Sequence, residues 1–181
     1  MEVDKTKHVF FISDTHFNHE NILKYENRPF NSVKEMNEEM IKLWNSVVKP
    51  GDVVYHLGDV GVKKDNLYDI LNQLNGTIYL IKGNHDYSIL NDTRIVNRFE
   101  WVKDYHVIRK LINKKIILFH FPIQVWDSEH YGAIHLFGHI HSNPNNVMKY
   151  QIPNSFNVSA DVIGLKPISL YDILKQINKE E

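Results

Sequence analysis

Five short clusters of Asp, His, Asn and Gly hold the side chains of this sequence that could do chemistry. In chain order they are Asp14-x-His16, Gly58-Asp59, Gly83-Asn84-His85-Asp86, His120 and Gly138-His139-x-His141. Each cluster directly follows an apolar run with the composition of a strand. Carboxylate, amide and imidazole groups are common ligands of divalent metal ions, so the clusters indicate metal chemistry.

Taken singly, each cluster has an ordinary explanation. Asp-x-His and Gly-Asp are common at turns, and a lone histidine such as His120 more often packs in a core or on a surface. The combination is more specific, because seven ligand-competent side chains give two ions about four ligands each if one carboxylate bridges. These seven are Asp14, His16, Asp59, Asn84, His120, His139 and His141.

The donor types limit which metals are expected. The chain has no cysteine, which excludes disulfides, a thiolate zinc site and a cysteine nucleophile. Mixed oxygen and imidazole donors suit manganese, iron, zinc, nickel or cobalt, and magnesium is also compatible. We therefore expect two divalent metal ions as cofactors.

The apolar runs predict the strands that must position these clusters. Strands are expected at 8–13, 52–57, 77–82, 101–111, 115–119, 134–137 and 156–160. Helices are expected at 33–48, 65–74 and 170–178, the first opened by Ser32 and Glu35 as a capping box. Short helical turns are expected at 86–98 and a loop at 142–154.

This order of elements predicts the fold class. The early alternation of strands and helices predicts a parallel sheet with right-handed crossovers, and the later run of strands suggests antiparallel pairing. Together they predict an α/β layered fold in one domain, residues 1–181, with two sheets packed as a mixed β-sandwich flanked by helices. Ligands of open α/β sheets bind beyond the carboxyl ends of strands, and all five clusters fall at such ends.

Composition narrows the class of protein. With 181 residues, 43% of them hydrophobic, and a net charge of −1, the chain is expected to be one ordinary soluble domain. This charge argues against tight nonspecific binding to DNA. Neither a signal-peptide pattern nor an apolar run near the roughly 18 residues of a membrane span is present, so we expect a cytoplasmic protein with no membrane partner.

The five clusters, in this order, resemble the calcineurin-like metallophosphoesterase superfamily over residues 14–141. The resemblance implies a helix-flanked β-sandwich and a phosphate-ester hydrolase in which a metal-bridging hydroxide attacks. It implies one metal held by Asp14, His16, Asp59 and His141. It implies a second held by Asp59, Asn84, His120 and His139, with Asp59 bridging. It implies that His85 assists the leaving group as a general acid or binds phosphate.

Departures from the superfamily pattern refine the expected substrate. The segment 58–61 lacks the Asp-Arg-Gly extension of protein serine/threonine phosphatases, and Phe121 follows His120 where many members have glycine. Residues 17–22 and 27–30 resemble a compact bacterial and phage subgroup without the insertions of larger nucleotidases. The analogy favours a phosphodiester, with a nucleotide among the candidates, over a monoester.

Four residues are candidates for substrate binding: Asn84, His85, Arg28 and His19. Arg28 could contact phosphate with two N–H groups, and an ordinary ion pair explains it equally well. Asp86 either orients His85 or shapes the turn.

Two other functions stay open. A scaffold that keeps the fold without metals is disfavoured because every expected ligand position carries a residue able to bind a metal. A nuclease of the same chemistry would need a basic groove, to which several lysines could contribute: Lys63, Lys64, Lys110, Lys114 and Lys115. No oligomeric state is predicted.

Overall fold

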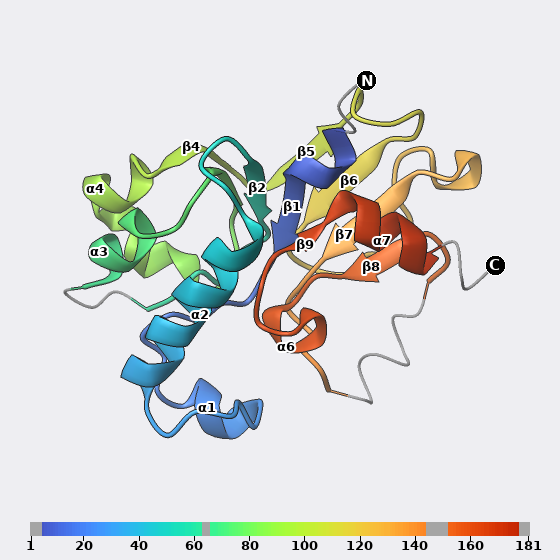
Figure 1. Cartoon of the computed structure of the whole chain (residues 1–181). Coiled ribbons are helices and arrows are strands. Elements are labelled where there is room, and N and C mark those ends of the chain that lie inside the picture. The colour runs from blue at the N-terminus through green and yellow to red at the C-terminus, as the bar shows by residue number, and fades with distance from the viewer. Residues whose placement is uncertain (1–4, 63–65, 144–151, 178–181) are drawn as a thin grey trace.

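The computed structural model describes residues 5–62, 66–143 and 152–177. Two β-sheets form the centre of the molecule, and helices flank them (Figure 1). The strand order is β4-β3-β2-β1-β9 in the first sheet and β5-β6-β7-β8 in the second. The predicted α/β layered sandwich of two mixed sheets is therefore confirmed.

The first sheet has strands β1 (Val9–Ile12), β2 (Val53–His56), β3 (Thr77–Ile81), β4 (Phe99–Lys103) and β9 (Ile168–Ser169). Strands β1 to β4 are parallel, and β9 is antiparallel to β1. The second sheet has strands β5 (Tyr105–Ile108), β6 (Ile116–Phe119), β7 (Ile134–Phe137) and β8 (Ser155–Asn157). Strand β5 is antiparallel to β6, while β6, β7 and β8 run parallel.

The helices connect and cover these strands. Within the described residues the α-helices are α1 (Ile22–Tyr25), α2 (Val33–Val47), α3 (Leu67–Asn72), α4 (Thr93–Val96), α6 (Ala160–Ile163) and α7 (Leu170–Ile177). The short 3₁₀ helices in the same part of the chain are η1 (Lys5–His8), η2 (Asp86–Asn91) and η3 (Glu129–Tyr131). Ser32 caps α2 as predicted, accepting the Glu35 N–H at 3.2 Å, while the Glu35 carboxylate accepts the N–H of Asn31.

Strand β1 lies between the two main apolar layers and is buried along its whole length. Because side chains alternate across a strand, Phe10 and Ile12 pack in the layer that α2 covers. Phe11 packs in the other layer, between the two sheets, together with Leu118 and Leu136. An apolar run without alternation is typical of such a central, doubly covered strand.

Two expectations about the later elements need correction. The segment expected as one strand, 101–111, is two strands in two different sheets, separated by a bend at Asp104. The later strands were expected to pair antiparallel; in the second sheet this holds for β5 with β6, while β6, β7 and β8 pair in parallel. The residues between β6 and β7 form a long crossover, which allows the parallel pairing.

Several boundaries differ from the expectation as well. Helix α3 extends from Leu67 to Asn72, within the expected range 65–74, while the described part of α7, Leu170–Ile177, agrees with the expectation. Positions 65, 178 and 144–151 lie outside the described residues. Helices α1 and α6 and strand β9 were not predicted from the sequence. Within the described residues, no helix is both long and apolar enough to cross a membrane.

Candidate metal centre

Three groups of side chains among the described residues could each hold a metal ion. The first comprises Asp14, His16 and His141, and the second Asp59, His120 and His139. The third, Glu26, His141 and Asp161, shares His141 with the first, and its Asp161 is already paired with Arg28. In each group the candidate ligand atoms all lie within 4.8 Å of one another. The residues of the first two groups follow the carboxyl ends of β1, β2, β6 and β7, so the predicted convergence of these loops is observed.

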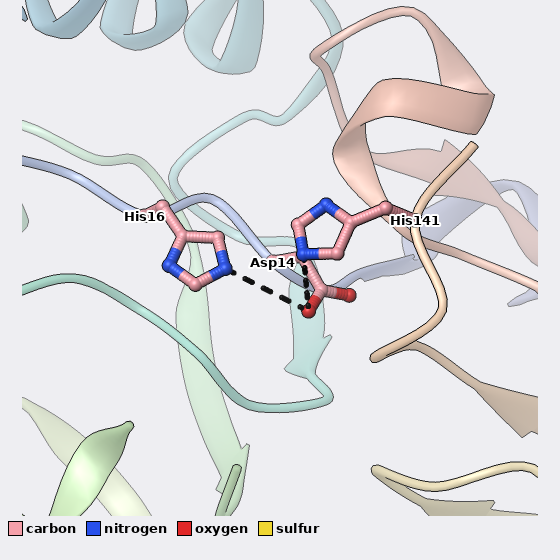
Figure 2. Close-up of side chains that lie close together, drawn as sticks. All are labelled: Asp14, His16 and His141. Carbon is pink, nitrogen blue, oxygen red and sulfur yellow. Dashed lines mark ion pairs between the residues drawn. The ribbon is translucent and has the colours of Figure 1, made fainter. Parts of the chain in front are cut away.

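The first group has the spacing of ligands around a single ion. Asp14 Oδ1 lies 3.6 Å from His141 Nε2 and 4.0 Å from His16 Nε2. Figure 2 shows both imidazoles directed at this one carboxylate oxygen. These separations are too long for hydrogen bonds. They are shorter than the roughly 4.4 Å that separates opposite ligands of one ion with bonds of about 2.2 Å.

Asp59 connects the first two groups. Its Oδ2 lies 3.7 Å from His16 Nε2 and 3.6 Å from His120 Nε2, so this one oxygen faces a histidine of each group. Its Oδ1 accepts the backbone N–H of His85 at 2.9 Å. Asn84 completes the second group, with Oδ1 3.1 Å from His120 Nε2. This geometry allows Asp59 to bridge two ions.

Hydrogen bonds fix the orientation of several candidate ligands. His120 Nδ1 lies 2.7 Å from the Leu57 carbonyl, which can only accept, so Nδ1 carries the proton and Nε2 is left as a donor atom to a metal. Asp14 Oδ2 accepts the His139 backbone N–H at 2.9 Å and the Ser159 hydroxyl at 2.8 Å, which directs Oδ1 to the histidines. Such outer contacts are typical of metal ligands.

Unpaired buried atoms provide a test of whether a cation fits. Within the described part of the chain, no hydrogen bond reaches Asp14 Oδ1 or either ring nitrogen of His16, although all three atoms are buried. Buried polar atoms without partners are rare because burial removes their bonds to water. A divalent ion beside Asp14 Oδ1 and His16 Nε2 would satisfy both, so the residues fit a metal.

The pKa shifts of His16, His139 and Asp14 favour the forms that bind metals. Burial lowers the pKa of His16 to about 3 and also lowers the pKa of His139, so both rings are neutral near pH 7, the form that binds metals. Burial opposes ionisation of Asp14, but His120, His141 and His16 outweigh it and lower the pKa of this carboxyl group. Burial raises the pKa of Asp59, and His120 opposes that shift.

Most candidate ligands have an unusual backbone conformation. Five of the seven have positive φ: Asp14 at 57°, His16 at 50°, Asp59 at 57°, His139 at 70° and His141 at 47°. The left-handed region is uncommon for residues other than glycine and costs roughly 1–2 kcal/mol each. Strain of this kind concentrates at functional sites, where the surrounding structure holds it.

Two glycines allow the loops to approach closely. A Cβ on Gly83 would collide with the Asp59 carboxylate, and one on Gly138 would collide with the side chains of Ser13 and Asp14. Gly83 and Gly138 precede the ligands Asn84 and His139 directly. The glycines of these motifs are therefore required by packing against the carboxylates.

Asp86 lies behind the same loops. Its Oδ2 accepts the N–H groups of Asp59 and Gly83 at 2.9 and 2.7 Å, and its Oδ1 accepts the Val60 N–H at 2.9 Å. Both carboxylate oxygens are used by backbone donors, which supports the alternative that Asp86 shapes the turn.

The predicted substrate-binding residues fall into two sets. Asn84 and His85 are exposed, and the His85 ring centroid lies 5.6 Å from that of His16. The His19 ring lies 5.3 Å from the same ring. Arg28 is only 5% exposed and donates to main-chain and carboxylate oxygens, which gives no support to its predicted contact with substrate.

Two residues not expected at the site, Ser159 and Asp161, contact Asp14 and His141 respectively. Ser159 was expected inside the strand at 156–160, but β8 ends at Asn157, so both residues follow a strand end as the predicted ligands do. The lysines expected for a basic groove gain no support: Lys115 is paired with Asp127 at 2.8 Å, while Lys63 and Lys64 lie outside the described residues.

Comparison with known proteins identifies relatives across the whole chain. The uncharacterized protein MJ1445 of Methanocaldococcus jannaschii is 40% identical over 176 residues, covering 94% of this chain and 92% of that protein. The gene 66 protein of Mycobacterium phage L5 is 26% identical over 201 residues, covering 95% and 96%. The crystal structure of a protein of unknown function, AQ665 from Aquifex aeolicus, matches with a TM-score of 0.73 and 28% identity, covering 93% and 98%.

More distant matches include Vps29 from Chaetomium thermophilum and zinc-complexed Vps29 from Entamoeba histolytica, with TM-scores of 0.38 and 0.36. Scores of this size support no conclusion about function. No protein-family model matches the chain. By its 40% identity over nearly the full length of both proteins, the chain belongs to the same family as MJ1445 of Methanocaldococcus jannaschii.

Proposed function

We propose that this protein is a hydrolase of phosphate esters that works with two divalent metal ions. The observation that carries the proposal is the position of Asp59 Oδ2, 3.7 Å from His16 Nε2 and 3.6 Å from His120 Nε2. One carboxylate oxygen thereby links the two candidate ligand groups into a single centre. Paired metal ions are typical of enzymes that cleave phosphate esters by in-line displacement.

The charge of the centre suits a phosphate ester. When bound, the ions would supply Lewis acidity and a reactive water at neutral pH. Two divalent ions carry four positive charges, and Asp14 and Asp59 neutralise two. Asp161 is already paired with Arg28, and the Asp86 carboxylate is held by backbone N–H groups. The remaining positive charge would attract a phosphate group and stabilise the charge that develops during its displacement.

His85 is the residue that we assign to proton transfer. Its backbone N–H donates to Asp59 Oδ1 at 2.9 Å, which anchors the residue at the centre, and its side chain is exposed beside His16. From this position the imidazole can donate a proton to the departing oxygen or a hydrogen bond to phosphate. A positioned general acid typically contributes about 10²- to 10⁴-fold in rate.

We favour a phosphodiester as the substrate. Asn84, His85 and His139 are all exposed, so the solvent-facing side of the centre has room for groups on both sides of a phosphorus atom. Phe121, whose ring centroid lies 4.6 Å from that of His139, offers an aromatic surface at the same side. Aromatic rings stack on nucleobases, which makes a nucleotide a candidate substrate.

Hydrolysis assays on metal-stripped protein test the proposal. Manganese, nickel, zinc or magnesium would be restored singly, with aryl phosphate monoesters and diesters as substrates. We expect activity to return with at least one metal and diesters to be cleaved faster than monoesters. A folded protein that takes up no metal, or is inactive with every metal, contradicts the proposed function.

A further inference from the structure

Arg28 and Asp161 form a buried ion pair beside the first ligand group. Their side chains are 1% and 4% exposed, and two hydrogen bonds join them. Arg28 Nε donates to Asp161 Oδ1 at 2.7 Å, and Nη2 donates to Oδ2 at 3.0 Å. This two-point geometry is the strongest form of arginine–carboxylate contact.

Each member of the pair also contacts candidate metal ligands. Asp161 Oδ2 lies 2.7 Å from His141 Nδ1, so this ring nitrogen is the donor and Nε2 faces Asp14 Oδ1. Arg28 donates from Nη2 to the Asp14 carbonyl and from Nη1 to the Thr15 carbonyl, both at 2.7 Å. The pair thus joins the segment that carries Asp14 and His16 to the one that carries His141.

All the N–H donors of Arg28 are directed at atoms of the protein. A guanidinium group has five N–H donors. Four of them go to the Asp161 carboxylate and the Asp14 and Thr15 carbonyls, and the fifth points to Met36 Sδ at 3.4 Å. The carbonyls belong to the stretch in which Asp14 and His16 have positive φ. Arg28 therefore holds the strained backbone, and its charge compensates the buried carboxylate that orients His141.

We propose that Arg28 and Asp161 are positioning residues for one metal ion: they fix Asp14, His16 and His141 and leave the group of Asp59, His120 and His139 unaffected. The inference rests on the proposed function only in requiring divalent ions at these groups. Outer partners of metal ligands typically change metal affinity 10- to 100-fold when replaced. The loss should fall on one ion of the pair.

Calorimetric titration of metal-stripped protein with manganese or zinc tests this directly. Wild-type protein should bind two ions. Asp161→Asn, which is nearly isosteric, and Arg28→Lys, which keeps the charge, should each bind one ion with wild-type affinity and the other about 10- to 100-fold more weakly. Absorption spectra of the cobalt(II)-loaded variants should show the coordination bands of one ion changed and those of the other retained.

Arg98→Lys is the matched control. Arg98 is a partly buried arginine that donates to the carbonyls of Leu71, Leu74 and Gly76, at the opposite ends of the strands from the ligands. Its replacement should lower stability and leave both metal affinities unchanged.

Three outcomes overturn the inference. Unchanged binding of both ions in Asp161→Asn and Arg28→Lys contradicts it and leaves the proposed function intact. Equal weakening of both ions, in these variants and in the Arg98 control, identifies a general loss of structure instead of selective positioning. Wild-type protein that binds no ion overturns both the inference and the proposed function. If Asp161→Asn does not fold, Arg28→Lys alone gives the decision.

Discussion

Replacement of Asp86 should destabilise the fold by removing the hydrogen bonds that hold the metal-binding loops together. This fully buried carboxylate accepts three backbone N–H groups, from Asp59, Val60 and Gly83, at 2.7–2.9 Å. It therefore ties the loop after β2 to the loop after β3. Burial raises the pKa of Asp86, and the three N–H donors oppose that shift.

The size of the effect follows from the number of bonds lost. In Asp86→Ala three buried donors lose a charged acceptor, and at about 1–2 kcal/mol each the free energy of unfolding should fall by about 3–6 kcal/mol. Asp86→Asn keeps the shape. If its carbonyl oxygen serves Asp59 and Gly83, its amide group opposes the Val60 N–H, so the fall should be about 1–3 kcal/mol.

Urea denaturation of metal-stripped protein, followed by tryptophan fluorescence, measures both values. Asp104→Ala is the control, because this carboxylate is 75% exposed and pairs with Lys82 on the surface. Its loss should change the free energy of unfolding by less than about 1 kcal/mol. A fall below about 1 kcal/mol for Asp86→Ala would refute the argument, since it would mean that the three N–H groups find other acceptors without loss.

Three further predictions concern pH, chemistry and packing. Burial lowers the pKa of His135 to about 4 from 6.5, so between these values the unfolded chain binds more protons. The contribution of His135 to unfolding free energy is complete above pH 6.5 and should fall by about 2 kcal/mol near pH 5. Urea denaturation should therefore find a pH dependence smaller by this amount in His135→Phe, with the contribution of His16 retained. His85→Ala should lose about 10²- to 10⁴-fold in turnover of substrates with poor leaving groups and much less with activated aryl esters, at unchanged metal content. An equal fold-loss relative to wild type with both kinds of substrate would exclude the role of His85 as an acid. In Gly138→Ala the added methyl group should push against Asp14, lower the free energy of unfolding by about 1–3 kcal/mol and weaken metal binding. Calorimetry that finds neither the stability nor the metal affinity changed would contradict the packing argument.

The strands that carry the candidate centre could be predicted because they are short, apolar and abruptly ended. Strand β1 was expected at 8–13 and is observed at Val9–Ile12, and Asp14 follows it as expected. The same holds for β7, observed at Ile134–Phe137 as predicted. Strands of this kind are buried on both faces, so a polar residue at the end marks the point where the chain leaves the core.

Pairing between strands was harder to predict, because apolar composition does not encode the partner. The bend at Asp104 moves the chain from β4 in one sheet to β5 in the other, within a segment that is apolar or aromatic on both sides. The parallel pairing of β7 with β8 depends on a crossover whose length does not reveal its direction. The local pattern of apolar residues predicts that a strand forms, but the packing of the whole chain determines which sheet the strand joins.

The role of Arg28 could not be predicted from the residues around it in the sequence, for a different reason. Its partner Asp161 is 133 residues away in sequence, and each residue alone is compatible with a surface ion pair. Arginine in a loop of a presumed phosphate-binding protein suggests contact with phosphate. The burial of Arg28 and its bonds to Asp14, Thr15 and Asp161 could be recognised only in the three-dimensional structure.

The backbone strain at the ligands explains why such distant anchors are needed. Five ligands with positive φ, each costing roughly 1–2 kcal/mol, would not hold this conformation in isolated loops. Arg28, Asp86 and Ser159 oppose that strain from the buried side, through bonds to backbone groups and to the Asp14 carboxylate. Within each ligand group the candidate ligand atoms consequently lie within 4.8 Å of one another. A centre organised in this way gives up little conformational entropy when a metal binds, so removal of an anchor should reduce metal affinity even where the sheets remain folded.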